Sequence, residues 1–139
     1  MLRLVARRFK GNNEAAQLTL MTANLAIRVA GIVGFFAVAL GAFGAHGFKD
    51  LLLRNNTTEI YHTAVLYHLV HAVVLLILAL RTPMRSGPFL SFLSGVLIFS
   101  GSLYLLAITN MRWLGAITPF GGVCFLVGWA WMVFAPERK

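Results

Sequence analysis

The sequence predicts an all-α polytopic membrane protein, a four-transmembrane-helix bundle with a short interfacial helix after the first span. Apolar residues make up 59% of the 139-residue chain, and the mean hydropathy is +0.80. Charged residues make up 12%, about half of the roughly 25% that is typical of a soluble domain. Four apolar runs of about 20 residues each match the thickness of the hydrocarbon core of a bilayer.

The apolar runs divide the chain into one membrane domain, residues 25–134, and two short tails. We expect the spans and tails at about these positions: spans 25–45, 60–80, 88–108 and 114–134, a basic tail 1–24 and a C-terminal tail 135–139. The single cysteine, Cys124, lies inside the last run, where a small apolar packing residue is the ordinary interpretation. One cysteine excludes an intramolecular disulfide and a CxxC redox pair, and with them the four-helix thiol oxidoreductases.

The first 20 residues are basic, with four Arg and Lys side chains against one acid, Glu14. Three interpretations remain open: a cytoplasmic amphipathic tail that touches lipid headgroups, an Arg-rich organelle transit peptide, and an over-long start ahead of Met21. We favour the first and the third. A secretory signal peptide is a poor fit, because this stretch has no apolar core of about 7–15 residues.

The first span ends in the motif GAFGAHGF, residues 41–48, which combines small residues with a histidine, His46. The residues that we expect to pack against another helix are small and lie three or four apart: Ala37, Gly41, Gly44 and Ala45. Small residues at this spacing let two membrane helices approach closely. We favour packing within the chain over the alternative, a homo-oligomer face.

The loop after the first span mixes leucines with charges. Phe48 and residues 51–53 are apolar, whereas Lys49, Asp50 and Arg54 are charged, which favours a short helix in the interface plane. Either Thr57 or Thr58 is suited to cap the next helix, because a hydroxyl can accept a bond from a free backbone N–H of the first turn.

The second span carries a polar stripe on an otherwise apolar helix. At about 100° per residue, Tyr61, His68 and His71 fall on one side, with Tyr67 at the edge of the stripe, whereas His62 points the other way. Unsatisfied polar groups are costly in hydrocarbon, so this stripe should face other helices. It lies in the same leaflet as His46.

The third and fourth spans each hold a further small-residue contact point. FSGSLY, residues 99–104, contributes Ser100, Gly101, Ser102 and Tyr104, whose hydroxyls can bond across helices. In the fourth span Pro119 lies in the first turns, so the regular helix is expected to begin there. Gly121 and Gly122 follow and allow close contact.

Together these segments predict one polar cluster in one leaflet. Its candidate members are the polar side chains of the first three segments: His46, Tyr61, Tyr67, His68, His71, Ser100, Ser102 and Tyr104. Nine Lys and Arg residues lie on the side of the two termini and three on the other side. The positive-inside rule then predicts cytoplasmic termini and a cluster in the outer leaflet. Without residues 1–20 the counts are five and three, with the same sign.

Four ordered motifs resemble a known family. These motifs are GAFGAHGF, TAVLYHLVHA (63–72), FSGSLYLLAIT (99–109) and LGAITPFGGVCFLVGW (114–129). Their order is similar to that in the domain-of-unknown-function 423 family, also called uncharacterised protein family 0382. Its members are small bacterial inner-membrane proteins related to eukaryotic transmembrane protein 256. The likeness covers about residues 21–134 and implies a four-helix integral membrane protein rather than a reaction. Many members have Gln where this chain has His68.

The scarcity of intramembrane charge favours a structural or accessory membrane component, or an assembly factor, without catalysis of its own. Charged groups inside spans usually mark ion paths and proton relays, and here only Arg28 lies near a span end. We expect the bilayer as the main partner, with a homo-oligomer or another membrane protein beside it. The net charge of +8 lies between the spans, so we expect no nucleic-acid binding.

Three alternatives remain. A small oligomeric transporter or channel could use the histidine and hydroxyl cluster to relay protons. A metal, haem or quinone site could form at His46 and His71, although no carboxylate or thiolate completes a ligand set there, and we predict no cofactor. An enzyme with Ser100 or Ser102 as nucleophile would lack an acid to orient its base, so we predict no enzyme activity.

Overall fold

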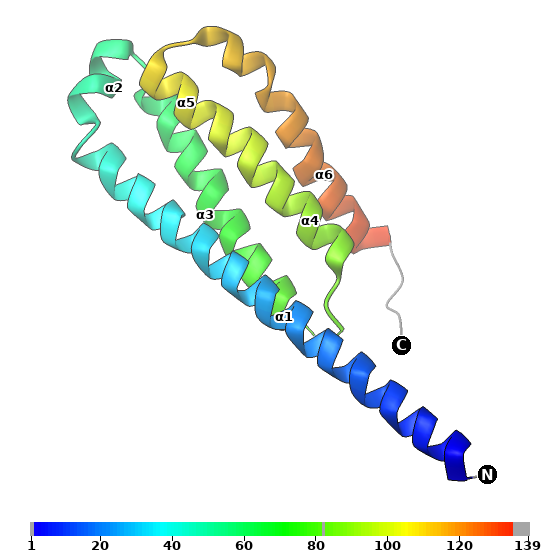
Figure 1. The fold of residues 1–139 in the computed structure, drawn as a ribbon. Helices are drawn as coiled ribbons and strands as arrows, with labels where there is room; N and C mark the ends of the chain where they lie inside the picture. Colours follow the sequence, from blue (N-terminus) through cyan, green and yellow to red (C-terminus); the bar gives the residue numbers. More distant parts are fainter. Residues whose placement is uncertain (1, 82, 135–139) are drawn as a thin grey trace.

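The computed structural model describes residues 2–81 and 83–134, with side chains from residue 22 onward (Figure 1). In chain order the helices are α1 (Leu2–Ala45), α2 (Lys49–Asn55), α3 (Thr58–Leu80), α4 (Ser86–Gly95), the π-helix η1 (Val96–Ser100), α5 (Gly101–Thr109), the 3-10 helix η2 (Arg112–Ala116) and α6 (Thr118–Phe134). The described part of the chain contains no strand, so the all-α prediction is confirmed. The predicted C-terminal tail, residues 135–139, lies outside the described residues.

Four helical stretches are long and apolar enough to cross a membrane. They are Thr22–Ala45, Thr58–Leu80, Ser86–Thr109 and Arg112–Phe134. The third is built from α4, η1 and α5, and the fourth from η2 and α6. The interfacial helix predicted after the first span is α2. The described residues of the predicted basic tail 1–24 are helical and continuous with the rest of α1, and the N-terminal part projects beyond the bundle (Figure 1).

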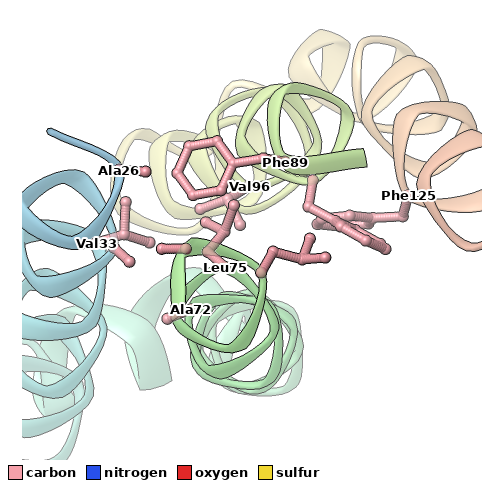
Figure 2. Packing of buried hydrophobic residues seen from close by; sticks show 11 residues of the cluster. Ala26, Val33, Ala72, Leu75, Phe89, Val96 and Phe125 are labelled. Carbon is pink, nitrogen blue, oxygen red and sulfur yellow. The ribbon is translucent and has the colours of Figure 1, made fainter. Parts of the chain in front are cut away.

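The spans form a bundle in which α1 and α6 lie at opposite sides (Figure 1). Helix α3 packs along α1 on one side and along α4, η1 and α5 on another, and α6 packs on α4 and η1. In the core, Ala26 and Val33 from α1 face Leu75 and Phe89, and Phe125 enters from α6 (Figure 2). Alanines on α1 permit this close approach, since helices without large side chains at the contact can bring their backbones together.

The corner between α2 and α3 is fastened to the end of α5. Helix α2 stops at Asn56, which adopts the left-handed conformation (φ 53°) that Asn tolerates better than most residues. Thr57 is the N-cap residue of α3, but its hydroxyl makes no capping bond, contrary to our expectation. It donates instead to the Ala107 carbonyl at 2.8 Å, and the Asn55 amide donates to the Ala107 and Ile108 carbonyls at 3.1 Å each. Two free carbonyls at the end of α5 are thereby satisfied.

Pro88 and Pro119 lie in the first turns of helices, as expected for Pro119. Pro88 is the third residue of α4, and Pro119 is the second residue of α6, where the missing N–H costs no helix bond. The π-helical turn at Val96–Ser100 was not predicted. Such turns carry little sequence signal, because they differ from α-helix by one extra residue in a turn. This turn places Phe99 and Ser100 in the middle of the third span.

Candidate functional site

The predicted polar cluster separates into two groups on two sides of α3. The first, which we call the His68 group, consists of Tyr61, His68 and Tyr104, between α3, α1 and α5. The second, the His71 groove, lies between α3, η1 and α6. The two groups differ in how their polar atoms are satisfied.

In the His68 group each polar side chain has a partner. The fully buried Tyr61 donates its hydroxyl to the Leu40 carbonyl of α1 at 2.7 Å. Its ring meets that of Tyr104 edge-on, with centroids 5.1 Å apart. Nδ1 of His68 lies 3.3 Å from the Tyr104 hydroxyl, and the backbone of Val33 on α1 is a further hydrogen-bond partner of the ring. Helices α1, α3 and α5 are therefore joined by polar contacts inside the membrane.

The two serines of FSGSLY behave differently. Ser102 Oγ lies 3.0 Å from the Phe99 carbonyl and 2.9 Å from the Thr118 hydroxyl, which ties α5 to the start of α6. Ser100 is buried in the π-helical turn, and its hydroxyl has no hydrogen-bond partner among the described residues. Neither serine is hydrogen-bonded to a histidine within the described ranges.

His71 is buried, with 5% of its surface exposed. One contact determines which ring nitrogen carries the proton in the neutral ring. Nδ1 lies 2.8 Å from the Tyr67 carbonyl one turn earlier. A carbonyl oxygen only accepts, so Nδ1 carries the proton, and in the neutral ring Nε2 is an acceptor. The ring stacks on Phe125 of α6, with centroids 3.7 Å apart and planes 12° from parallel. Nε2 is buried without a partner in the described part of the chain.

His71 lines a groove of about 450 Å³ on the α6 side of the bundle. Its walls are aromatic and aliphatic side chains together with one glycine and one proline: Tyr67, His71, Phe99, Pro119, Gly122, Val123, Phe125, Leu126 and Trp129. Tyr67 stacks obliquely on Phe99, with centroids 4.6 Å apart, and Trp129 stands edge-on to His71 at 6.3 Å. None of these lining residues is charged.

His46 does not join the cluster, so this part of the prediction is wrong. It is exposed at the end of α1, two residues after Gly44, which packs against Tyr61. His71 lies ten residues after Tyr61, or about 15 Å along α3. His46 lies at the same end of the bundle as the start of α3, as predicted. The rise of α3 places His71 far from that end. A shared metal or haem on these two histidines is therefore ruled out by distance.

The predicted helix-packing residues divide in a similar way. Ala37 is buried. A Cβ added at Gly44 would overlap the Tyr61 ring, and one added at Gly121 would overlap the Phe99 backbone. A Cβ added at Gly41 would lie 3.4 Å from a Val65 methyl carbon, and one added at Gly122 would lie 3.9 Å from the Phe99 ring. Both contacts are looser.

Ala45 and Gly101 were wrongly predicted. Ala45 is exposed, because the α1 stripe passes from Ala37 to Gly44, seven residues on, rather than along a strict four-residue spacing. Gly101 has open space where a Cβ would be, since it lies about 100° around the helix from the buried Ser100.

Three tight glycines were missed: Gly87 against Trp131, Gly95 against Phe125 and Gly128 against Phe92. The seven-residue spacing of Gly121 and Gly128 was the available signal for the α6 face.

Comparison with known proteins places the chain among membrane proteins. The DUF423 family, described as "Protein of unknown function", matches residues 40–122. The UPF0382 membrane protein YwdK of Bacillus subtilis (strain 168) is 40% identical over 114 residues, 77% of this chain and 91% of the relative. The UPF0382 inner membrane protein YgdD of Escherichia coli (strain K12) is 39% identical over 125 residues, 85% and 93% of the two chains. No solved structure matches.

Proposed function

Since this chain belongs to the DUF423 family of membrane proteins, whose function is unknown, we propose that it is a small structural or accessory component of the membrane without catalysis of its own. The motif resemblance to this family is thereby confirmed. The observation that carries the proposal is how the intramembrane polar groups are used: the hydrogen bonds of Tyr61, His68 and Tyr104 join helices to one another. Polar groups that bond one helix to another specify how the helices pack, and those groups are not available to act on a substrate.

The charge distribution supports the same proposal. Within the described spans the acidic side chain is Glu59 in the first turn of α3, and basic side chains lie near span ends. A proton or ion path usually needs ionisable groups deep in the membrane. The transporter alternative depended on a joint histidine and hydroxyl cluster, and His46 is not part of one. A serine hydrolase is not favoured either, since neither Ser100 nor Ser102 is hydrogen-bonded to a histidine among the described residues.

An accessory role is tested by native mass spectrometry of the full chain released gently from its own membranes. We expect a stable assembly with a second membrane protein, together with no ion or proton flux from the purified protein in liposomes. Flux above that of empty liposomes would contradict the proposal. A chain released alone at 15.3 kDa from fresh membranes would contradict it as well.

We also propose that the protein lies in the bacterial inner membrane with both termini in the cytoplasm. The support is the count of nine Lys and Arg residues on the terminal side of the spans against three on the other. Fusion of a fluorescent protein to the C-terminus should give fluorescence, and fusion of alkaline phosphatase at the same position should give no activity. The reverse pattern would overturn this orientation.

A further inference from the structure

The line along which α1 packs on α3 follows a seven-residue repeat. Among the side chains of α1 that the structure describes, the buried ones all lie on this line: Ala26, Ala30, Val33, Ala37 and Gly44. The steps between them are four, three, four and seven residues. Alternating steps of three and four are the spacing of a coiled-coil seam, which keeps one line of a helix against its neighbour. We call this line the α1 seam.

Continued towards the N-terminus, the α1 seam leaves the bundle. Its next position is Ala23, which is half-buried. The same alternation of steps then reaches six further positions of the helix, four of them apolar: Thr19, Ala16, Asn12, Phe9, Val5 and Leu2. Figure 1 shows this part of α1 beyond the ends of the other helices. The seam therefore continues past the interface with α3, and no described helix covers the continued part.

The charge around the continued seam has one sign. Arg3, Arg7, Arg8 and Lys10 lie within the first ten residues, which contain no acid. Arg8 directly precedes the seam position Phe9, and charges beside a seam set the choice of partner in coiled coils. A second copy of this segment would bring like charges together, which opposes association. A helix that carries carboxylates beside its own apolar line is complementary instead.

The distance from the bilayer separates a protein partner from a lipid surface. The first span begins at Thr22, and α1 is continuous from Leu2 onward. At about 1.5 Å per residue, the backbone of Lys10 lies about 18 Å and that of Arg3 about 28 Å beyond the start of the span. The polar layer of one leaflet is about 5–8 Å deep, and salt screens charges beyond about 10 Å. Contact of these positions with headgroups would need a break in α1.

We propose that the part of α1 beyond the bundle is a docking helix for an acidic amphipathic helix of a partner membrane protein. This inference rests on the accessory role proposed above and adds the chemistry of the partner. The partner helix packs its apolar line on the seam positions Leu2, Val5 and Phe9, and its carboxylates lie beside the arginines. Asn12 is a polar position within the seam, and in coiled coils such a residue fixes the register at a cost in affinity.

Position-specific photo-crosslinking tests the docking face in the full chain in its own membranes. The crosslinking residue, para-benzoylphenylalanine, replaces either Phe9 on the seam or Leu4, an apolar residue nearby that lies outside the seam and serves as the matched control. We expect a crosslink to another membrane protein from position 9 and none from position 4. The crosslinked segment, identified by mass spectrometry, should be net acidic, with apolar residues three and four apart.

A charge reversal tests complementarity. Arg3→Glu, Arg7→Glu and Arg8→Glu, made together, should lower the crosslink yield from position 9 by about tenfold or more, because carboxylates then face carboxylates. The matched control is Lys at the same three positions, which keeps the charge and should keep the yield within about twofold. All three positions lie outside the bundle, so the melting temperature in mild detergent should not change. An unchanged melting temperature separates lost docking from lost folding.

Several outcomes would overturn the docking helix. Equal crosslinking from positions 4 and 9 would show that the seam is not used. A crosslink from position 9 to lipid would place the segment on the membrane, and one to a second copy would make it a homo-oligomer contact. An unchanged yield after charge reversal, or a crosslinked segment that is not acidic, would exclude an acidic partner. If no protein is crosslinked while native mass spectrometry still shows an assembly, only the docking helix fails and the accessory role stands.

Discussion

The two sides of α3 both carry buried side chains but differ in their polar chemistry. Towards α1 and α5, Tyr61 and His68 are paired with the Leu40 carbonyl and the Tyr104 hydroxyl. Towards α6, His71 stacks on Phe125 at 3.7 Å, yet its Nε2 has no partner among the described residues. On the α1 and α5 side, Tyr61, His68 and Tyr104 each have a hydrogen-bond partner. On the α6 side, the buried acceptor His71 Nε2 has none among the described residues.

This difference shows what a histidine in a membrane helix can indicate. Burial alone does not separate the two rings, which are 6% and 5% exposed. The hydrogen-bond partner separates the two rings. A ring bonded to another helix stabilises the bundle, whereas a ring bonded only to its own helix leaves one nitrogen free. The first kind joins two helices by a hydrogen bond, and the second does not.

The largest effect that we expect concerns one tight glycine contact on each side of the bundle. Gly121→Ala on the His71 side would force a Cβ into the Phe99 backbone, and Gly44→Ala on the His68 side would force one into the Tyr61 ring. Each should destabilise by about 3 kcal/mol, seen as a lower melting temperature in mild detergent. Gly122→Ala is the matched control and should change little, since its Cβ would meet Phe99 at 3.9 Å. A tolerant Gly121 would mean that the α6 side is loosely packed.

A smaller effect separates the two sides through their tyrosines. Tyr104→Phe removes the hydroxyl that His68 contacts and leaves Nδ1 of that ring buried and unpaired, which should cost about 1–2 kcal/mol. Tyr67→Phe on the groove side should cost less than about 0.5 kcal/mol, because Tyr67 is 40% exposed. Unfolding in graded detergent mixtures measures both. Equal losses would erase the contrast between the paired and unpaired sides.

The smallest effect concerns two threonines at the start of α3. Thr57→Val removes the bond to the Ala107 carbonyl and should cost about 1 kcal/mol, because that hydroxyl is buried. Thr63→Val removes only a bond to the Glu59 carbonyl on the same helix at an exposed position, and the melting temperature should barely change. A larger loss at Thr63 would show that helix-internal bonds matter as much as bonds between helices.

Much of the fold could be predicted from the sequence, because span length and hydropathy are local properties. The four spans and the interfacial helix follow from apolar runs and from the mixture of leucines and charges after Phe48. The π-helical turn at Val96–Ser100 could not be predicted, since its sequence, VLIFS, suits an α-helix equally well.

The candidate site was harder to predict than the fold. The stripe of Tyr61, His68 and His71 is buried as expected, since helical periodicity fixes which residues share a face. The partners of each residue depend on the tilt and rise of helices around α3, which spacing does not provide. His46 was included because it shares a leaflet with the start of α3. Phe125 and Trp129 were left out because the predicted cluster was built from histidines and hydroxyl-bearing side chains.

The central claim is that His68 holds the bundle together and His71 does not. It is tested most directly by unfolding His68→Phe and His71→Phe side by side with the unchanged chain. We predict that His68→Phe loses about 1–2 kcal/mol, since Tyr104 loses its partner, and that His71→Phe is neutral or stabilising, because it removes a buried acceptor that had no partner. A loss at His71 equal to or greater than that at His68 would contradict the account.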